Sequence, residues 1–238
     1  MNIKKELLYE GKAKKVFATS NPNEVIVEFK DDITAFNKQK QSQIAGKGEI
    51  NNQITAIIFT YLAEKGLSTH FKKVISSNDQ LCTKVSIFPI EVIVRNLVAG
   101  SLAKRLDIKE GTEVKHPIFE LSYKNDRLGD PLLTDSHATA VGLVSKEILA
   151  KIYESAAKVN KYLSELLAKS NILLVDFKIE YGQDNNGNLL LADEISPDTC
   201  RFWDKDTHYK LDKDRFRKSL GKEFAAYQEI LNRLTKQN

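Results

Sequence analysis

The stretch LLVDFKIEYG, residues 173–182, decides the fold predicted for this chain. Its polar residues Asp176, Lys178 and Glu180 alternate with apolar residues, which is the period of a β-strand. The three polar side chains therefore share one face of the strand, while the apolar side chains form the other face. We expect the apolar face to pack against a core.

The chain is predicted to reverse directly after this strand. Residues 184–187 form the turn sequence Asp-Asn-Asn-Gly, and LLLADE at 189–194 returns as a second strand that brings Asp193 near Glu180. Two carboxylates on adjacent strands suit Mg²⁺, which takes few protein ligands and also binds nucleotide phosphates. The alternative is a solvated polar face, but residues 189–192 are too apolar for a freely solvated hairpin.

Further strands, several of them consecutive, and helices are predicted in the sequence before and after this hairpin. Segments rich in valine and isoleucine predict strands at 7–17, 24–30, 70–76, 81–87 and 91–98. Apolar residues at helical spacing predict helices at 49–65, 102–107, 146–170 and 222–236. Ser145 is a good N-cap for the third helix. This order predicts an α+β fold with antiparallel sheets and packed helices, rather than a doubly wound parallel sheet.

The first predicted strand carries GKAKK at 11–15, and its hairpin turns at 20–23. Gly11 allows a ligand to approach the backbone closely. Lys12 and Lys14 share one face of a strand, so two ammonium groups could meet the phosphates of a nucleotide lying over the hairpin. The alternative is a lysine-rich edge strand that blocks unwanted pairing.

A phosphate site is predicted in FPIEVIVRNLVAGS, residues 88–101. Alternation places Glu91 and Arg95 on one face, and the strand leads into Ser101 at the start of a short helix. Amides and a hydroxyl at a helix N-terminus suit phosphate, and Arg95 could add a bidentate contact. The alternative is an ion pair between Glu91 and Arg95 on the sheet surface, with Ser101 as a simple N-cap.

The stretch DEISPDTCRFWD, residues 193–204, is predicted to be irregular and mixes charges with the only tryptophan. Such loops commonly carry function. Asp198 could accept hydrogen bonds from ribose hydroxyls, and Arg201 could bind a phosphate. Alternatively, Arg201 pairs with Asp198 or stacks on Trp203.

The composition narrows the function classes. Of the 238 residues, 42% are apolar and 29% charged, and no apolar run approaches the ~20 residues of a membrane-spanning helix. The charged N-terminus lacks a secretory signal pattern, so we expect a cytoplasmic protein without a membrane partner. The modest net charge of +4 favours small anionic substrates over nucleic acid. Two isolated cysteines and four histidines lack metal-ligand spacing, and covalent catalysis is not expected.

These segments together resemble the SAICAR synthetase family of purine biosynthesis. The resemblance rests, in the family's order and spacing, on LYEGKAKKVF at 8–17, FPIEVIVRNLVAGS at 88–101, LLVDFKIEYG at 173–182, DEISPDTCRFWD at 193–204 and DKDRFR at 212–217. It implies a two-lobed α+β fold related to ATP-grasp and inositol phosphate kinase architectures. It further implies a nucleotide-binding lobe at 1–84 and a substrate- and metal-binding lobe at 85–238, with ATP between them.

The resemblance also implies roles for individual residues. It assigns nucleotide contacts to Lys12, Ala13, Lys14 and Lys84, and magnesium to Glu180 and Asp193. It assigns the substrate 5′-phosphate to Arg95, Ser101 and Arg201, and the ribose to Asp198. It places Glu91, Asp176 and Lys178 around the imidazole and its carboxylate. The residues with implied catalytic roles are Lys12, Lys14, Asp176 and Lys178.

The implied reaction is ATP-dependent amide formation between L-aspartate and the carboxylate of a phosphoribosyl-aminoimidazole, with Mg²⁺ as cofactor. A sugar or inositol phosphate kinase is the first alternative, and a basic RNA-binding module is the second, because the isoelectric point is about 8.8. The residues that bind the carboxylates of aspartate are not assigned, and the candidates are Lys213, Arg215 and residues 31–37. The base that takes the proton from the attacking amine is not assigned either. A homodimer is also left open.

Overall fold

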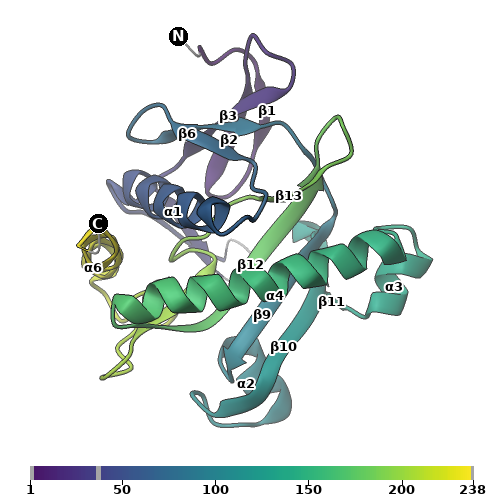
Figure 1. Ribbon diagram of the computed structural model, residues 1–238. Coiled ribbons are helices and arrows are strands. Elements are labelled where there is room, and N and C mark those ends of the chain that lie inside the picture. Colours follow the sequence, from purple (N-terminus) through teal and green to yellow (C-terminus); the bar gives the residue numbers. More distant parts are fainter. Residues whose placement is uncertain (1–2, 36–38, 237–238) are drawn as a thin grey trace.

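Figure 1 shows the computed structural model, which describes residues 3–35 and 39–236. The first sheet is antiparallel, with strand order β1-β2-β3-β7-β6. Its strands are β1 (Leu7–Glu10), β2 (Lys14–Ala18), β3 (Glu24–Phe29), β6 (Phe71–Val74) and β7 (Asp79–Thr83). A separate two-stranded sheet consists of β4 (Asp32–Ala35) and β5 (Lys40–Gln43).

The second sheet is also antiparallel and is organised around β12 (Ile172–Gln183), the strand that contains the deciding stretch. The main strand order is β11-β10-β9-β12-β13, and β14 and β8 also pair with β12. The remaining strands are β8 (Ser86–Ile87), β9 (Ile90–Leu97), β10 (Glu113–Tyr123), β11 (Leu132–Leu133), β13 (Leu189–Ala192) and β14 (Cys200–Asp204).

The longest helix, α4 (Lys146–Lys169), crosses one face of the second sheet (Figure 1). Its side chains Ile152, Val159 and Leu163 are fully buried in the main core, together with Phe177 and Ile179 of β12. Burial of this apolar stripe is what holds a helix on a sheet. With that face covered, the polar face of β12 is left for the site.

All other helices are shorter than α4, and the longest of them, α1 (Lys47–Glu64), lies beside the first sheet. Helix α1 contacts β3, β6 and the closing helix α6 (Glu223–Thr235). The short helices are α2 (Gly100–Leu106), the 3₁₀ helix η1 (Asp126–Leu128), α3 (Asp135–Ala140) and α5 (Asp214–Arg217). Within residues 3–35 and 39–236, no helix combines the length and apolarity needed to cross a membrane.

The predicted α+β class with antiparallel sheets is confirmed, as are the central hairpin and the long helices. The Ser145 side chain caps α4 by accepting a hydrogen bond from the Ile148 amide at 3.2 Å. Glu180 pairs with Ala192 across the hairpin, which places Asp193 beside Glu180 as expected. Local patterns were sufficient here because caps, turns and periodicity act over a few residues.

The predicted single strand at 7–17 is wrong. The chain turns at 11–13, where the Gly11 amide donates to the Lys14 carbonyl at 2.8 Å, and the segment forms the β1–β2 hairpin. Lys12 therefore lies in a turn, so it does not share a strand face with Lys14. The β2–β3 hairpin that follows is the one predicted.

Three further predictions of local structure are wrong. The strand predicted at 81–87 divides, because β7 pairs with β3 in the first sheet and β8 pairs with β12 in the second. No strand or helix was predicted at 31–48, but this segment contains β4, β5 and the start of α1; residues 36–38 lie outside the described residues. The stretch 193–204, expected to be irregular, ends in β14, and β10 was not predicted. Strand pairing decides these segments, and pairing partners are distant in sequence.

Candidate active site

A cavity opens over the polar face of β12 and consists of two adjoining hollows. The polar hollow has a volume of about 440 Å³, and the apolar hollow about 470 Å³. Both are lined by Tyr9, Lys14, Lys124, Glu180 and Asp193, so these residues stand where the two hollows meet. One ligand can therefore reach from an apolar pocket into a charged one.

Nearly all predicted site residues come together in this cavity. The polar hollow is lined by Lys12, Ala13, Lys14, Glu91, Arg95, Ser101, Asp176, Lys178, Glu180, Asp193, Asp198 and Arg201. Lys84 lines the apolar hollow instead. Each residue lies at the cavity, but its ligand remains a prediction.

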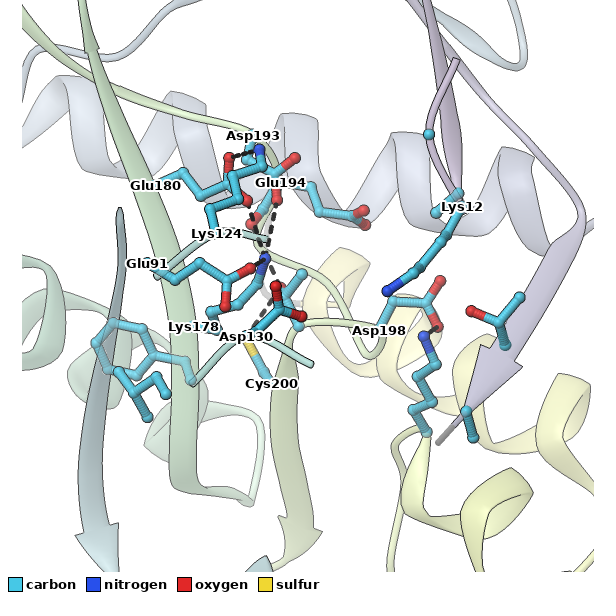
Figure 2. Close-up of a pocket in the computed structure, with 18 of the residues that line it drawn as sticks. Lys12, Glu91, Lys124, Asp130, Lys178, Glu180, Asp193, Glu194, Asp198 and Cys200 are labelled. Carbon is cyan, nitrogen blue, oxygen red and sulfur yellow. Dashed lines mark hydrogen bonds and ion pairs between the residues drawn. The ribbon is translucent and has the colours of Figure 1, made fainter. Parts of the chain in front are cut away.

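The carboxylate end of the polar hollow consists of Glu91, Glu180, Asp193 and Glu194 with Lys14, Lys124 and Lys178. Figure 2 labels all of these residues except Lys14. Lys14 pairs with Asp193 and, at 2.9 Å, with Glu194. Lys178 bridges Glu91 at 2.8 Å and Glu180 at 3.0 Å. Lys124 pairs with Glu180. Four carboxylates face three ammonium groups, so the formal charge of this end is −1.

Three groups of the carboxylate end, Asp193, Lys14 and Lys178, are held in their charged forms. Burial alone would raise the pKa of Asp193, but Lys14 and Lys178 bring that pKa well below its usual range. Burial alone would lower the pKa of Lys14, but Asp193 and Glu194 raise it well above normal. Burial would also lower the pKa of Lys178, yet its carboxylate neighbours, Glu180 first, raise it. Asp193, Lys14 and Lys178 are therefore ionised around neutral pH.

The donor set of this end fits a magnesium ion that also binds a substrate phosphate. Among the described residues, no group of three or more histidine, cysteine, aspartate or glutamate side chains is arranged to hold a metal. Mg²⁺ needs fewer, because one or two carboxylates plus phosphate oxygens and waters suffice. Glu180 of β12 and Asp193, which directly follows β13, supply two neighbouring carboxylates, and the net charge of the end favours a cation.

The backbone at Asp193 is held in an unusual conformation. Its φ of 63° is left-handed, which non-glycine residues rarely adopt without support. The His70 ring donates from Nε2 to the Asp193 carbonyl at 3.2 Å. His70 is buried and stacks edge-on against Phe59. The sequence pattern did not point to His70, because its partner lies 123 residues away.

The cationic end is the other network of ion pairs around the polar hollow. It consists of the cations Lys47, Arg95, Arg105, Arg201, Lys213 and Arg217 with the carboxylates Glu120, Asp176, Asp198 and Asp214. Six cations face four carboxylates, so the formal charge is +2. Figure 2 shows Asp198 and Lys12 on the side of the hollow away from Glu180 and Lys178.

Arg95 and Arg201 converge on Asp176. Buried Arg95 donates to Asp176 at 2.8 Å and to the Ser101 hydroxyl at 3.1 Å. Arg201 donates to Asp176 at 2.8 Å and to Asp214 at 2.9 Å. The geometry places two guanidinium groups and a hydroxyl together, which is a suitable cradle for phosphate.

The structural alternatives for this segment are wrong. Glu91 does not pair with Arg95; it accepts hydrogen bonds from Lys178 and, at 2.9 Å, from Ser122. The N-cap of α2 is Ala99, so Ser101 is not the cap. Gly100 has a φ of +55°, and a Cβ there would lie 2.3 Å from an Arg201 nitrogen. Glycine at this position lets the Arg201 side chain pass.

Asp198 is held by the protein itself. Its carboxylate accepts hydrogen bonds from Lys47 at 2.6 Å, Asn51 at 3.0 Å and Tyr227 at 2.8 Å. Burial would raise the pKa of Asp198, but Lys47 and Lys213 hold it well below its usual range. The expected alternatives for Arg201 are wrong, because it contacts neither Asp198 nor the Trp203 ring, which lies under Lys210 at 4.5 Å.

The sequence analysis missed the wall of the apolar hollow and several charged residues. The wall is formed by Leu8, Tyr9, Val16, Val25, Val27, Ile87 and Pro89. Apolar residues in strands normally indicate core, so no local signal separates a pocket wall from a buried face. The missed charged residues that line the polar hollow include Lys124, Asp126, Asp130, Glu194 and Arg217.

Comparison with known proteins agrees with this geometry. The sequence profile of a family described as SAICAR synthetase matches residues 7–234. The phosphoribosylaminoimidazole-succinocarboxamide synthase of Clostridium perfringens is 57% identical over 229 residues, covering 96% of this chain and 97% of that protein. The corresponding synthase of Clostridium acetobutylicum is 56% identical, with 98% of both chains covered.

Solved structures also match over nearly the whole chain. The crystal structure of the synthase from Ehrlichia chaffeensis has a TM-score of 0.95 at 47% identity, covering 97% of this chain and 98% of that one. A SAICAR synthetase in complex with ADP has a TM-score of 0.94 at 50% identity, with the same coverage. The chain belongs to the SAICAR synthetase family.

Proposed function

We propose that this chain is an ATP-dependent ligase, a phosphoribosylaminoimidazole-succinocarboxamide synthase. It joins L-aspartate to the carboxylate of 5-amino-1-(5-phosphoribosyl)imidazole-4-carboxylate through an acyl phosphate, and releases ADP and phosphate in purine biosynthesis. The observation that carries the proposal is one cavity containing an apolar hollow, a carboxylate end and a cationic end. The names of the relatives and the ADP complex of a similar structure support it.

ATP is assigned to the junction of the two hollows. The apolar hollow, with Lys84 on its wall, suits the adenine ring, since apolar walls with few polar groups are typical of such pockets. Lys14 lines both hollows and can meet the phosphates, and Lys12 and Ala13 lie farther along the polar hollow. Residues 1–84 would then form the nucleotide-binding lobe and 85–238 the substrate- and metal-binding lobe.

Magnesium is assigned to Glu180 and Asp193. When bound, the ion would supply charge neutralisation and polarisation at the transferring phosphate. These two carboxylates form ion pairs with Lys14, Lys124 and Lys178. If a cation took the place of the lysines there, their ammonium groups could turn toward the phosphate oxygens. The lysines thus contribute to binding with or without the metal.

The ribonucleotide is assigned to the face of β12 and β9. Arg95, Ser101 and Arg201 form the 5′-phosphate cradle. Asp198 is the proposed ribose contact, and its three protein donors fix the position of its carboxylate. The residues proposed to surround the imidazole and its carboxylate are Glu91, Asp176 and Lys178.

The chemistry requires activation of a carboxylate. An oxygen of the ribonucleotide carboxylate attacks the γ-phosphorus of ATP, ADP leaves, and an acyl phosphate forms. The aspartate nitrogen then attacks the acyl carbon, phosphate leaves, and the nitrogen loses a proton. In these steps Lys12, Lys14 and Lys178 position the reacting groups and stabilise the developing charge, and no enzyme nucleophile is needed.

The alternatives account for fewer of these observations. A sugar or inositol phosphate kinase would share the phosphate-transfer residues but would not require aspartate. An RNA-binding module would need free lysines on the first hairpin, but Lys12 pairs with Asp126 at 2.7 Å and Lys14 is buried among carboxylates.

The proposed enzyme is cytoplasmic, and light scattering will determine whether it is a homodimer.

The proposal is tested by measuring phosphate release from MgATP with the carboxyaminoimidazole ribonucleotide, with and without L-aspartate. We expect release to require aspartate and to accompany formation of the succinocarboxamide. Phosphate transfer without aspartate, yielding a stable phosphorylated product, would support the kinase. Replacing Mg²⁺ with EDTA should stop turnover, and full turnover without a divalent ion would contradict the metal assignment.

A further inference from the structure

Asp193 lies where the regular strand pattern of the central hairpin breaks. Side chains of an extended strand alternate between two faces, so neighbouring residues point in opposite directions. Asp193 directly follows β13, and its φ of 63° is left-handed rather than extended. Past this turn, Asp193 and Glu194 both form ion pairs with Lys14. The left-handed backbone therefore allows two successive carboxylates to reach one ammonium group.

A left-handed conformation at a non-glycine residue persists only where its surroundings fix it. The Asp193 carbonyl accepts a hydrogen bond from His70 Nε2 at 3.2 Å. A carbonyl oxygen can only accept, so Nε2 carries the proton of this bond. A different backbone conformation at Asp193 would reorient the carbonyl and break the bond, which is costly for a buried donor. The hydrogen bond therefore favours the left-handed form.

His70 is itself fixed to both sheets. Its amide donates to the Leu191 carbonyl of β13 at 2.8 Å, and its carbonyl accepts from the Thr83 amide of β7 at 2.7 Å. Its ring is buried and packs edge-on against Phe59, with the two centroids 5.7 Å apart. The ring thus has a fixed place beside β13, which makes it a firm support for the residue that follows this strand.

His70 also lies at the nucleotide side of the cavity. His70 and Asp193 both line the apolar hollow, which is assigned to adenine, and Asp193 also lines the polar hollow. The ring therefore reaches the backbone of a proposed metal ligand from the wall of the nucleotide pocket. Packing alone would not require this hydrogen bond, because an apolar side chain of similar volume also fills a core.

We propose that His70 is a positioning residue for the metal site: its N–H holds the Asp193 backbone so that the carboxylate faces the nucleotide phosphates. The inference rests on the proposed function, in particular on the assignment of Mg²⁺ to Asp193, and deepens it. His70 acts through Asp193, because its hydrogen bond is to the carbonyl of that residue. Loss of a group that orients a metal ligand commonly weakens the metal site by about ten- to a hundredfold.

The test compares His70→Gln with His70→Met. Both substitutions replace the ring with an unbranched side chain of similar length, but only glutamine keeps an N–H as many bonds from the backbone as Nε2. The pair therefore differs in the donor and hardly in volume. Ile152→Val is the control for stability, because Ile152 is fully buried in the same core, on the helix that covers the other face of the sheet.

The measured quantity is the Kd of ADP, determined by isothermal titration once with Mg²⁺ and once with EDTA. The ratio of the two Kd values shows how far the metal strengthens nucleotide binding, and a direct contact between the side chain at position 70 and the nucleotide cancels in it. We expect His70→Met to lower this ratio by about tenfold. His70→Gln should restore most of it, and Ile152→Val should lower thermal stability while leaving the ratio unchanged.

Turnover gives a second reading of the same effect. His70→Met should need correspondingly more Mg²⁺ for half-maximal activity, while its KM for the ribonucleotide should stay unchanged, because that substrate is assigned to the other end of the cavity. A general loss of structure would instead alter both parameters together.

Each other outcome contradicts the positioning role. A wild-type ratio in His70→Met would overturn it, and equal losses in His70→Gln and His70→Met would assign the effect to the ring rather than to its N–H. If neither variant folds, a crystal structure of the wild type with MgADP decides the matter, because it should keep the bond from His70 to the Asp193 carbonyl. A ratio of one in the wild type would instead reject the metal assignment, and absence of aspartate-dependent turnover would reject the ligase function, so these failures are distinguishable.

Discussion

The two ends of the polar hollow differ in how their charges balance. The carboxylate end has four carboxylates against three ammonium groups, whereas the cationic end has six cations against four carboxylates. Each end is partly neutralised by the protein and keeps a surplus of one sign. A surplus of negative charge favours cations at the first end, and a surplus of positive charge favours anions at the second.

The most disruptive change at the carboxylate end should be Asp193→Asn. It removes a proposed metal ligand, so we expect kcat to fall by about a thousandfold or more, in keeping with the loss of transition-state charge stabilisation. The fold should persist, because Asp193 lies at the end of β13. The measurement is kcat against Mg²⁺ concentration, alongside thermal unfolding. An unaltered Mg²⁺ dependence would remove Asp193 from the metal site.

The corresponding change at the cationic end is Arg95→Ala. Arg95 is 3% exposed and bridges Asp176 and Ser101, so its loss should weaken ribonucleotide binding by about a hundredfold. The Kd for ATP should change little, because the nucleotide is assigned to the other end. Isothermal titration with each substrate separates the two. Equal losses of affinity for both substrates would show that the ends are not independent.

Asp198→Asn tests whether the cationic end depends on its shared carboxylates for stability. The substitution leaves the buried ammonium group of Lys47 without its ion pair at 2.6 Å. Breaking a buried pair on one side costs about 3 kcal/mol, so we expect the free energy of unfolding to fall by that amount. Denaturant unfolding measures it, with Lys218→Met as the surface control. A change below about 0.5 kcal/mol would mean that Lys47 finds another partner.

The smallest expected effect concerns pH. Burial and the neighbouring Asp214 raise the pKa of Asp212 to about 7, whereas the carboxyl of an unfolded chain titrates near its ordinary value of 3.8. The folded state therefore binds this proton more tightly, and the stability it contributes is present below about pH 4 and is lost as pH rises to about 7. Between pH 5 and 7 the loss should be about 2 kcal/mol.

The control for this prediction is Asp212→Asn, which cannot ionise and should lose this contribution to the stability curve. Burial lowers the pKa of His70 to about 4, so His70 contributes in the opposite sense, with stability that is lost as pH falls from about 6.5 to about 4. The difference between the two curves therefore isolates Asp212. Parallel stability curves for the wild type and Asp212→Asn, measured by urea unfolding at several pH values, would show that Asp212 titrates normally.

The predictability of the two ends also differed. At the carboxylate end, the alternation of Asp176, Lys178 and Glu180 and the turn at 184–187 placed Asp193 beside Glu180 from local sequence alone. At the cationic end, the alternatives offered for Arg95 and Arg201 were wrong. Their partners come from β10, β12 and α5, and no local pattern specifies which carboxylates those are.

The sequence by itself determined the elements whose causes are local. These are the β12–β13 hairpin and the capped helix α4. The tertiary structure alone decided the pairs Lys14–Asp193 and Lys47–Asp198, whose members are 179 and 151 residues apart. Strand register and helix packing set such contacts, and they depend on the whole core rather than on any short stretch.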